Sequence, residues 1–427
     1  MKMTSAEQAL NLIQDGDTLW CHSMAATPYS LLDSLARVAL DKRDLTLLSL
    51  HTEKSGALCD PALQGHLRQR VFFVGGPTRP AINCGMADYV PIFLSEIPKL
   101  FRSGEQVIDT AIVQVSPPDK HGLCSLGISV EATRAAMQKA KRVIAQINPN
   151  MPRTHGDSFV HLNDFAAYVE IDSVVPEHLP AEQDPVTQQI GRNVASLIRD
   201  GDCLQMGIGA IPDATLACLG DRQHLGIHTE MFSDGVLALL EKGVFTNRNK
   251  KKHPGKIVTT FAMGSNKLYD FVDDNPEVVF LDVAYTNDTA VIRQNPQVVA
   301  INSALQVDLS GQVCADSLGT KIYSGVGGQM DFVRGASLSE GGRAIIALPA
   351  TAAGGKVSRI SSLLSPGAGV VTTRAHVHYI VTEFGVAYLR NKSLTERAQA
   401  LINIAAPQFR EQLARQAFDD WGLRVRA

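Results

Sequence analysis

Two stretches of similar sequence, NLIQDGDTLWCH at residues 11–22 and SLIRDGDCLQMG at residues 196–207, decide how the chain is organised. Both carry Asp-Gly-Asp directly before a short apolar run, and Asp15 in the first stretch corresponds to Asp200 in the second. A glycine turn that leads into an apolar run is typical of the start of a strand. Since 185 residues separate the two aspartates in a chain of 427, the sequence predicts two duplicated halves.

A second echo supports the duplication. His51-Thr52-Glu53 follows the strand-like run LTLLSL, and His228-Thr229-Glu230 stands shortly after the dipeptide Leu225-Gly226. These tripeptides are 177 residues apart, which puts this echo eight residues out of register with the first. The two echoes occur in the same order in each half, as expected for a duplicated unit.

Short runs rich in β-branched residues alternate with stretches of helical character. Strands that alternate with helices form parallel sheets with both faces covered. Many runs end in Gly, Pro or Asn, which places loops at the strand ends, where open α/β sheets bind ligands. We therefore predict an α/β fold with two similar open, mainly parallel sheets. The runs are VIDTAIVQV (107–115), RVIAQI (142–147), KIVTTF (256–261), PEVVFLDV (276–283), RAIIALP (343–349) and HVHYIVTEF (376–384).

The segment between the halves, residues 171–190, reads IDSVVPEHLPAEQDPVTQQI. Its three prolines and four acidic residues in twenty positions cannot sustain one long helix or a central strand. We predict a linker here, with an N-terminal domain at 1–185 and a C-terminal domain at 186–427.

The composition indicates an ordinary compact chain of two to three domains of about 150 residues each. Hydrophobic residues make up 45% and charged residues 19% of the sequence, which excludes intrinsic disorder. Lys and Arg total 40 against 43 Asp and Glu, for a formal charge of −3. Without an excess of positive charge to neutralise phosphates, we expect no nucleic-acid partner.

Nothing in the sequence indicates a membrane or an oxidising compartment. No apolar run approaches the roughly 18 residues of a membrane span, and MKMTSAEQALNLIQDGD has acids where a signal peptide is apolar. The seven cysteines are odd in number and none forms a CxxC pair, so we expect reduced core thiols rather than disulfides or a zinc site. These observations predict a cytoplasmic protein with no metal ligands.

Two glycine-rich turns stand out after the usual catalytic motifs, HExxH, GxSxG and the P-loop, prove absent. In the turn at 205–213, a strand from Cys203 passes through two glycines into a helix opened by Pro212, so backbone N–H groups could face an anion. It reads GxGxxP rather than GxGxxG, and a plain tight turn explains it equally well. The second turn, 324–332, has three glycines within four residues, which suits an oxyanion hole or close approach of a bound group.

Three glutamates compete for a catalytic role. Glu230, Glu53 and Glu383 each follow a threonine at the end of a strand-like run, and spacing by itself does not choose among them. From residue type alone, a helix cap or an ion pair explains Glu230 better than catalysis does.

A loop with the sequence TNRNKKKHPGK, residues 246–256, concentrates positive charge. Such a run is usually a solvated surface loop, and contact with ligand phosphates is the alternative. We call it the basic loop.

Several segments together resemble the acetyl-CoA hydrolase/transferase family, and within it most closely the 4-hydroxybutyrate and butyryl-CoA:acetate CoA-transferases. The similarity spans nearly the whole chain, in order. The segments are GMADYVPIFLSEIPKLF (85–101), SPPDKHGLCSLG (116–127), MPRTHGDSFVH (151–161), LQMGIGAIPDA (204–214), GIHTEMFSDG (226–235), YSGVGGQMDFVRGA (323–336), GGKVSRI (354–360) and VHYIVTEFGVAYL (377–389).

The resemblance implies an enzyme that binds coenzyme A as a substrate, with no permanently bound cofactor, in the cleft between two α/β domains. It implies that Glu230 is the nucleophile and gives that role to neither Glu53 nor Glu383. The implied CoA contacts are Gln205, Met206, Gly207, Ile208, Gly209, Leu305, Gly328 and Lys356.

The implied reaction moves CoA from a short-chain acyl-CoA to a short carboxylate such as acetate, through a glutamyl-CoA thioester on Glu230. A glutamate with the ordinary pKa of about 4.3 is ionised at pH 7 and needs no base to attack a thioester. The expected oxyanion donors are the N–H groups of Gly327 and Gly328 and the side-chain amide of Gln205.

Two alternatives remain open at this stage: an acyl-CoA hydrolase that uses the same glutamate, and a CoA-binding module without catalysis. The acyl group is also open, because one methylene or hydroxyl changes binding by only about 1–3 kcal/mol. We expect a homo-oligomer from the frequency of symmetric assemblies.

Overall fold

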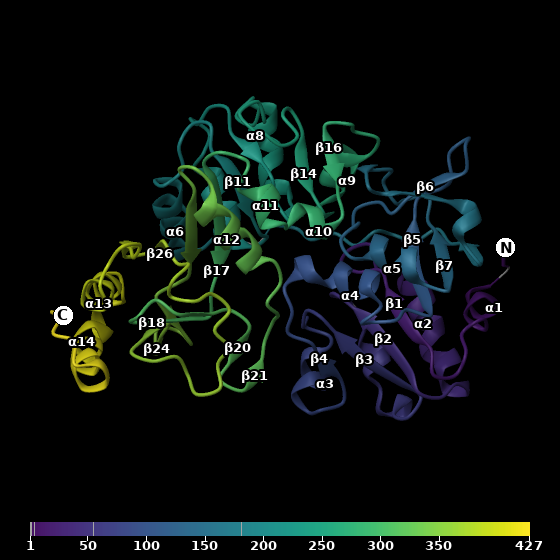
Figure 1. Ribbon diagram of the computed structural model, residues 1–427, viewed down its shortest axis with the longest axis horizontal. Coiled ribbons are helices and arrows are strands. Elements are labelled where there is room, and N and C mark those ends of the chain that lie inside the picture. Colours follow the sequence, from purple (N-terminus) through teal and green to yellow (C-terminus); the bar gives the residue numbers. More distant parts are fainter. Residues whose placement is uncertain (1, 4, 54, 181) are drawn as a thin grey trace. The chain divides into compact units, whose positions relative to one another are not determined.

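The computed structural model describes the chain except residues 1, 4, 54 and 181. The chain forms two compact units, each with its own sheet (Figure 1). Neither unit is one continuous stretch of sequence, because two later segments return to the first. Unit 1 consists of Met1–Leu179, Val258–Thr286 and Ile322–Gly327; unit 2 consists of Pro180–Ile257, Asn287–Lys321 and Gly328–Ala427.

Unit 1 is built on a seven-stranded sheet in the order β10-β7-β5-β1-β2-β3-β4. All of its pairings are parallel. The central strands are almost wholly buried, as expected for a sheet covered on both faces. The strands are β1 (Thr18–Cys21), β2 (Leu45–Ser49), β3 (Leu67–Val71), β4 (Asp88–Tyr89), β5 (Thr110–Val115), β7 (Arg142–Ile147) and β10 (Ala167–Glu170).

Helices and short strands complete unit 1. The α-helices are α1 (Ala6–Leu10), α2 (Tyr29–Val38), α3 (Arg79–Asn83), α4 (Ile97–Ser103), α5 (Thr133–Lys139), α9 (Asn266–Val272) and α10 (Val283–Thr286). The short strands are β6 (Leu123–Ser125), β8 (His155–Gly156), β9 (Phe159–His161), β14 (Ile257–Thr259), β15 (Phe261–Ala262) and β16 (Val278–Phe280). Leu, Ile and Val side chains from β1, β2, β5, β7 and α2 form one hydrophobic core.

Unit 2 is built on a six-stranded sheet in the order β12-β11-β17-β22-β26-β27. The first five strands are parallel, and β27 pairs antiparallel with β26. The strands are β11 (Cys203–Met206), β12 (Gly226–Ile227), β17 (Val298–Ser303), β22 (Arg343–Ala347), β26 (Tyr379–Thr382) and β27 (Gly385–Tyr388).

The remaining elements of unit 2 surround this sheet. The α-helices are α6 (Pro185–Ala195), α7 (Ala210–Ala217), α8 (Leu237–Glu241), α11 (Thr289–Ile292), α12 (Gln329–Leu338), α13 (Leu394–Asn403) and α14 (Pro407–Trp421). The short strands are β13 (Met231–Phe232), β18 (Gln306–Asp308), β19 (Val313–Cys314), β20 (Ser317–Leu318), β21 (Lys321–Ile322), β23 (Thr351–Ala352), β24 (Val357–Ser358) and β25 (Ile360–Ser361).

The two sheets repeat the same topology, which confirms the predicted fold class. Strands β1, β2, β5, β7 and β10 stand in the spatial order 2-1-3-4-5, and β11, β12, β17, β22 and β26 stand in that order too. In such sheets the direction of winding changes between the first and third strands, and ligands bind beyond the carboxyl ends at that switch point. In unit 2 the switch point lies between β11 and β17.

The repeated Asp-Gly-Asp has the same structural role in both units. Asp15 Oδ1 accepts the Arg43 N–H at 3.0 Å, and Asp200 Oδ1 accepts the Gln223 N–H at 2.8 Å. Each bond ties the turn before one strand to the loop before the next strand. The glycine between the aspartates has φ of 78° in the first copy and 81° in the second, a conformation that favours glycine.

The second aspartate of each copy makes a buried ion pair across the sheet. Asp17 pairs with Arg142, and Asp202 pairs with Arg343. Each arginine begins the fourth of the five strands that the two sheets share, β7 or β22. The echo in the sequence is therefore a duplicated structural contact, which explains why the residue type recurs.

The predicted linker is partly correct. Apart from residue 181, residues 171–184 form neither helix nor strand, whereas the last six predicted linker residues lie in α6. Within the described chain, no helix is long and apolar enough to cross a bilayer.

The prediction that all cysteines are core residues is wrong in part. All seven are free thiols; Cys21, Cys124, Cys203 and Cys314 are buried, Cys59 and Cys218 are half-buried, and Cys84 is exposed.

Candidate active site

The first glycine-rich turn connects β11 to α7, as predicted. Gly209 has φ of 113°, which only glycine adopts readily. Helix α7 then begins at Ala210 and packs against α6, where a β-carbon at Gly191 would lie 2.6 Å from the Ala214 backbone. Gly207 is different, because a β-carbon there would meet nothing within 4 Å. Space for an added group is therefore open at Gly207 and closed at Gly191.

Gln205 lies at the switch point of the unit 2 sheet. It is on β11, and its side chain accepts a 3.1 Å hydrogen bond at Oε1 from Asn302 Nδ2 on the neighbouring strand β17. Because Asn302 engages the oxygen of the Gln205 amide, the Nε2 end of that amide is directed away from Asn302. Gln205 is 5% exposed, so its amide is fixed in orientation by burial and by this bond.

Glu230 follows the short strand β12 by three residues. The Thr229 hydroxyl before it donates to the Met206 carbonyl at 2.9 Å and accepts the Met206 N–H at 3.3 Å, which ties this segment to the end of β11. The Glu230 Oε2 atom accepts a 2.7 Å hydrogen bond from Asn287 Nδ2. A β-carbon at Gly328 would overlap both Oε2 of Glu230 and Nδ2 of Asn287. The structure thus packs the Glu230 carboxylate directly against the Gly328 backbone.

Asn287 connects two carboxylates. Its Nδ2 donates to Glu230 and also lies 3.3 Å from Oδ2 of Asp331, which is 6% exposed on α12. Asn287 is fully buried, and its Oδ1 atom has no hydrogen-bond partner among the residues that the structure describes. An amide held between two carboxylates can present only its N–H groups to them, so its role at Glu230 is that of a donor.

The environment of Glu230 corrects the expected ionisation. Burial raises the pKa of Glu230 to about 7; Asn287 acts in the opposite direction, and the charge of Asp331 adds to the rise. The expectation of an ordinary glutamate pKa is therefore wrong, because loss of hydration penalises the carboxylate more than one hydrogen bond stabilises it.

The other predicted residues lie at separate places in the fold. Gly327 belongs to unit 1, where its carbonyl accepts the Leu94 N–H at 3.1 Å, and Gly328 begins the part of unit 2 that forms α12. Leu305 is half-buried between β17 and β18, and Lys356 is exposed in the turn between β23 and β24. Met206 is buried, whereas Ile208 beside it is 44% exposed, which is unusual for an isoleucine.

The two competing glutamates have other partners. Glu383 Oε2 accepts the Ala350 N–H at 2.8 Å. Glu53 Oε1 lies 3.2 Å from Nε2 of both His51 and His178, and these two contacts lower the pKa of Glu53 to about 2.

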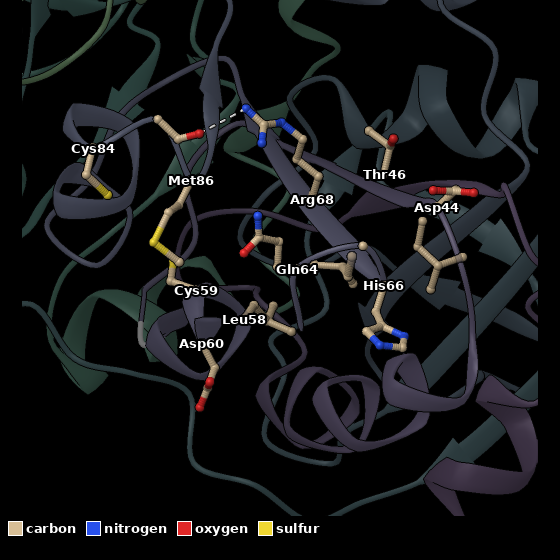
Figure 2. A pocket seen from close by; sticks show the side chains of 14 residues that line it. Asp44, Thr46, Leu58, Cys59, Asp60, Gln64, His66, Arg68, Cys84 and Met86 are labelled. Atoms are coloured by element: carbon tan, nitrogen blue, oxygen red, sulfur yellow. Dashed lines mark hydrogen bonds between the residues drawn. The ribbon is translucent and has the colours of Figure 1, made fainter. Parts of the chain in front are cut away.

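Unit 1 has a cavity of about 520 Å³, and Figure 2 shows the side chains that line it. It opens where β2 and β3 begin, and its wall includes Asp44, His66, Cys59, Cys84 and Arg68. The Arg68 guanidinium is ion-paired with Asp88 and also donates to the Gly85 carbonyl, as the dashed line in Figure 2 marks. None of the predicted catalytic or CoA-binding residues lines this cavity.

Sequence reasoning missed Asn287, Asp331 and Asn302. Asp331 stands inside the glycine-rich segment that was singled out, but nothing marked it as a partner of Glu230. Asn287 lies 57 residues from Glu230 in a stretch without a motif. Among the residues that the structure describes, no group of three or more His, Cys, Asp or Glu side chains could hold a metal ion.

Comparisons with known proteins agree with this architecture. The N-terminal domain of the acetyl-CoA hydrolase/transferase family matches residues 1–179, and its C-terminal domain matches residues 264–417. The chain is 49% identical over 412 residues to 4-hydroxybutyrate coenzyme A transferase of Clostridium kluyveri, covering 96% of each chain. It is 36% identical over 437 residues to butyryl-CoA:acetate CoA-transferase of Anaerostipes caccae, covering 97% of this chain and 96% of that one.

Solved structures have the same fold over nearly the whole length. The crystal structure of 4-hydroxybutyrate CoA-transferase from Porphyromonas gingivalis has a TM-score of 0.84 at 36% identity and covers 98% of both chains. The structure of RipA from Yersinia pestis has a TM-score of 0.91 at 37% identity and covers 98% of this chain and 97% of that one. The chain belongs to the acetyl-CoA hydrolase/transferase family, as a CoA-transferase.

Proposed function

We propose that this CoA-transferase moves CoA from a short-chain acyl-CoA, such as acetyl-, butyryl- or 4-hydroxybutyryl-CoA, to a short carboxylate such as acetate, with Glu230 as the nucleophile. The observation that carries the assignment is the half-buried Glu230 carboxylate, held by Asn287 against a backbone position where only glycine fits. A half-buried carboxylate with a raised pKa and a hydrogen-bond donor beside it is typical of a functional group rather than of a surface ion pair.

In the first half-reaction, one oxygen of ionised Glu230 attacks the thioester carbonyl carbon of the acyl-CoA. The C–S bond breaks, CoA leaves as a thiolate, and an acyl-glutamyl anhydride remains. The thiolate then attacks the glutamyl carbonyl carbon of this anhydride. The bond between the glutamyl carbonyl carbon and the bridging oxygen breaks, so the original acyl group leaves as its carboxylate with that oxygen, and Glu230 carries CoA as a thioester.

The acceptor carboxylate reverses these two steps. Its oxygen attacks the glutamyl thioester, CoA thiolate leaves, and the new anhydride is then attacked by the thiolate at the acceptor carbonyl. The products are the new acyl-CoA and the free Glu230 carboxylate. No proton is consumed in the cycle, so only the ionised form of Glu230 can start it.

Each tetrahedral intermediate carries an oxyanion that needs donors in place. We assign this role to the N–H groups of Gly327 and Gly328 and to the Nε2 group of Gln205. Asn287 is a further donor, and its contact with Glu230 Oε2 supports this. On this assignment Gln205→Ala reduces kcat by about 10²-fold and leaves CoA affinity within about threefold; an unchanged kcat removes Gln205 from the mechanism.

We assign CoA binding to the turn Gln205–Gly209 together with Leu305, Gly328 and Lys356. This assignment is supported by the position of the turn at the switch point of the unit 2 sheet and by the open space at Gly207. CoA contacts far from the sulfur supply binding energy that orients the glutamyl thioester. We also propose a homo-oligomeric state. The division into domains 1–185 and 186–427 is kept as a boundary in the sequence, which the segments 258–286 and 322–327 of unit 1 cross.

The test is the intact mass of the protein after incubation with acetyl-CoA or butyryl-CoA, with and without acetate, followed by peptide mapping. We expect a gain of one CoA less water on the peptide that contains Glu230, reversed by acetate and absent in Glu230→Gln. Steady release of free CoA without an acceptor and without an adduct would instead mean a hydrolase. Retained CoA binding without exchange or hydrolysis would mean a binding module, and either result overturns the proposal.

A further inference from the structure

The strand that leads to Glu230 is an edge strand. Strand β12 pairs with β11 on its inner side, where Gly226 N–H donates to the Asp202 carbonyl at 2.8 Å and His228 N–H donates to the Leu204 carbonyl at 3.1 Å. Backbone groups alternate along a strand, so those of Ile227 point to the outer side. Among the described residues the six-stranded sheet has no further strand there, and only Leu225, before the strand, forms an isolated bridge, with Phe245. Ile227 is 3% exposed, and unpaired buried peptide groups are costly.

The basic loop supplies the missing partners with two side chains. Asn247 Oδ1 accepts the Ile227 N–H at 2.8 Å, and the Lys250 ammonium donates to the Ile227 carbonyl at 2.7 Å. Both side chains are buried, at 5% and 4% exposure. Asn247 has φ of 54°, a conformation that asparagine adopts more readily than most residues. Together they replace the neighbouring strand that β12 lacks.

The loop is folded around this ammonium. Lys250 Nζ also donates to the Lys256 carbonyl at 2.6 Å, which closes the loop on itself. The lysine stem fits because Gly226 has no side chain: a β-carbon there would lie 3.0 Å from Lys250 Cγ. The N–H groups of Lys251 and Lys252 bind Asn295 Oδ1 at 3.1 and 2.9 Å, which anchors the loop to the rest of unit 2. Both alternatives for the basic loop, a solvated surface and a phosphate contact, are therefore wrong for Lys250.

We propose that Lys250 and Asn247 are positioning residues that fix the peptide of Ile227 and, through it, the placement of Glu230. The inference rests on the proposed role of Glu230 as nucleophile. Between Ile227 and Glu230 the chain is also held by the Thr229 bonds to Met206, so the segment that precedes Glu230 is fixed at Ile227 and at Thr229. The Glu230 carboxylate has little room to move, because it contacts Gly328 and Asn287. Misplacement of a reacting group by 1 Å can reduce a rate by about 10²-fold.

The test compares Lys250→Met with Lys251→Met, the same change at the neighbouring, exposed position of the loop. Lys250→Met keeps most of the stem and removes the donor. We expect its kcat for CoA exchange and its rate of adduct formation on Glu230 to fall by about 10²-fold, while the KM for acyl-CoA stays within about threefold. Lys251→Met should retain the wild-type kcat and KM. A folded Lys250→Met protein with the wild-type kcat overturns the proposal. So does a variant whose KM for acyl-CoA rises while its kcat stays unchanged.

A second variant keeps the test decisive if Lys250→Met does not fold. Asn247→Ala removes the acceptor of the Ile227 N–H and leaves the ammonium in place, and we expect about a tenfold lower kcat at unchanged KM. Asn247→Gly, which adopts the φ of 54° without the strain that alanine has there, should show the same loss. Failure of the proposed function looks different, because the wild-type protein itself would then form no adduct on Glu230. If the wild-type protein forms the adduct on Glu230 and Asn247→Ala forms it at the same rate, the positioning role is refuted and the proposed function stands.

Discussion

The two His-Thr-Glu tripeptides occupy equivalent strand ends and place their glutamates in opposite environments. Glu53 follows β2 in unit 1, lies 3.2 Å from Nε2 of two histidines, and has its pKa lowered to about 2. Glu230 follows β12 in unit 2, accepts the amide N–H of Asn287, lies near Asp331, and has its pKa raised to about 7. Fold position and local sequence are shared, so only the groups packed around each carboxylate separate an ion-paired residue from a proposed nucleophile.

The largest expected effect separates the two glutamates by activity. Glu230→Gln removes the attacking oxygen, and we expect the exchange rate to fall by about 10⁴-fold or more with no CoA adduct. Glu53→Gln leaves the attacking group intact and should still form the adduct on Glu230. The measurement is the exchange rate together with adduct mapping for both variants. Exchange by Glu230→Gln, or an adduct that maps to Glu53 in the wild-type protein, would reverse the assignment.

The next effect tests how tightly the Glu230 carboxylate is packed. A β-carbon at Gly328 would overlap Glu230 Oε2, so Gly328→Ala should displace the carboxylate or Asn287 and lower kcat by about 10² to 10³-fold. Gly76→Ala in unit 1 is the matched control, because a β-carbon there meets nothing within 4 Å and its φ is ordinary. Rates are compared under saturating acyl-CoA and acetate. A Gly328→Ala protein as active as Gly76→Ala would show that Glu230 moves away from this backbone before it reacts.

The sequence predicts the strands and the duplication better than it predicts the environment of Glu230. The β-branched runs located β5, β7, β14, β16, β22 and β26 but not β3, β10 or β17, and the Asp-Gly-Asp and His-Thr-Glu echoes predicted a duplication that the strand orders confirm. Those signals are local in sequence. The pKa of Glu230 was predicted wrongly because it depends on burial and on Asn287 and Asp331, which reach it only through the tertiary fold.

The basic loop teaches the same lesson for charge. A run of lysines predicts a solvated surface, and Lys251 is indeed exposed, but Lys250 beside it is buried. Which lysine turns inward depends on the two unpaired backbone groups of Ile227, more than 20 residues earlier. Similarly, no pattern marked residues 258–286 and 322–327 as segments that pack in unit 1.

The two carboxylates should also affect stability with opposite signs. Because the pKa of Glu230 is about 7 in the folded protein and near 4.5 otherwise, its burial penalty appears as pH rises from 4.5 to 7 and reaches about 3 kcal/mol above that. Glu230→Gln should therefore raise the free energy of unfolding increasingly between pH 5 and pH 8. For Glu53 the lowered pKa contributes stability that is complete above pH 4.5 and is lost as pH falls toward 2.

Thermal or denaturant unfolding of both variants at pH 5, 6, 7 and 8 measures this difference. Glu53→Gln should destabilise the protein by about 1 kcal/mol, a value reduced for the partial exposure of Glu53. A Glu230→Gln variant that is no more stable than the wild type at pH 8 would mean that the carboxylate is better hydrated or better bonded than the structure indicates.

The smallest effect concerns the pH at which the enzyme becomes active. Only ionised Glu230 attacks, so kcat/KM should rise about tenfold per pH unit below 7 and level off above it. Asn287→Ala removes the donor that favours the carboxylate and should move the midpoint of the rise up by about one pH unit, whereas Asp331→Asn removes a repelling charge and should move it down by a similar amount.

The profiles of kcat/KM against pH between 5 and 9 measure both shifts. Opposite shifts from two neighbours of one carboxylate identify that carboxylate as the group that titrates, since a distant group would not respond to both. If neither variant moves the midpoint, the titrating group is another residue, and the contrast between Glu230 and Glu53 does not control the reaction.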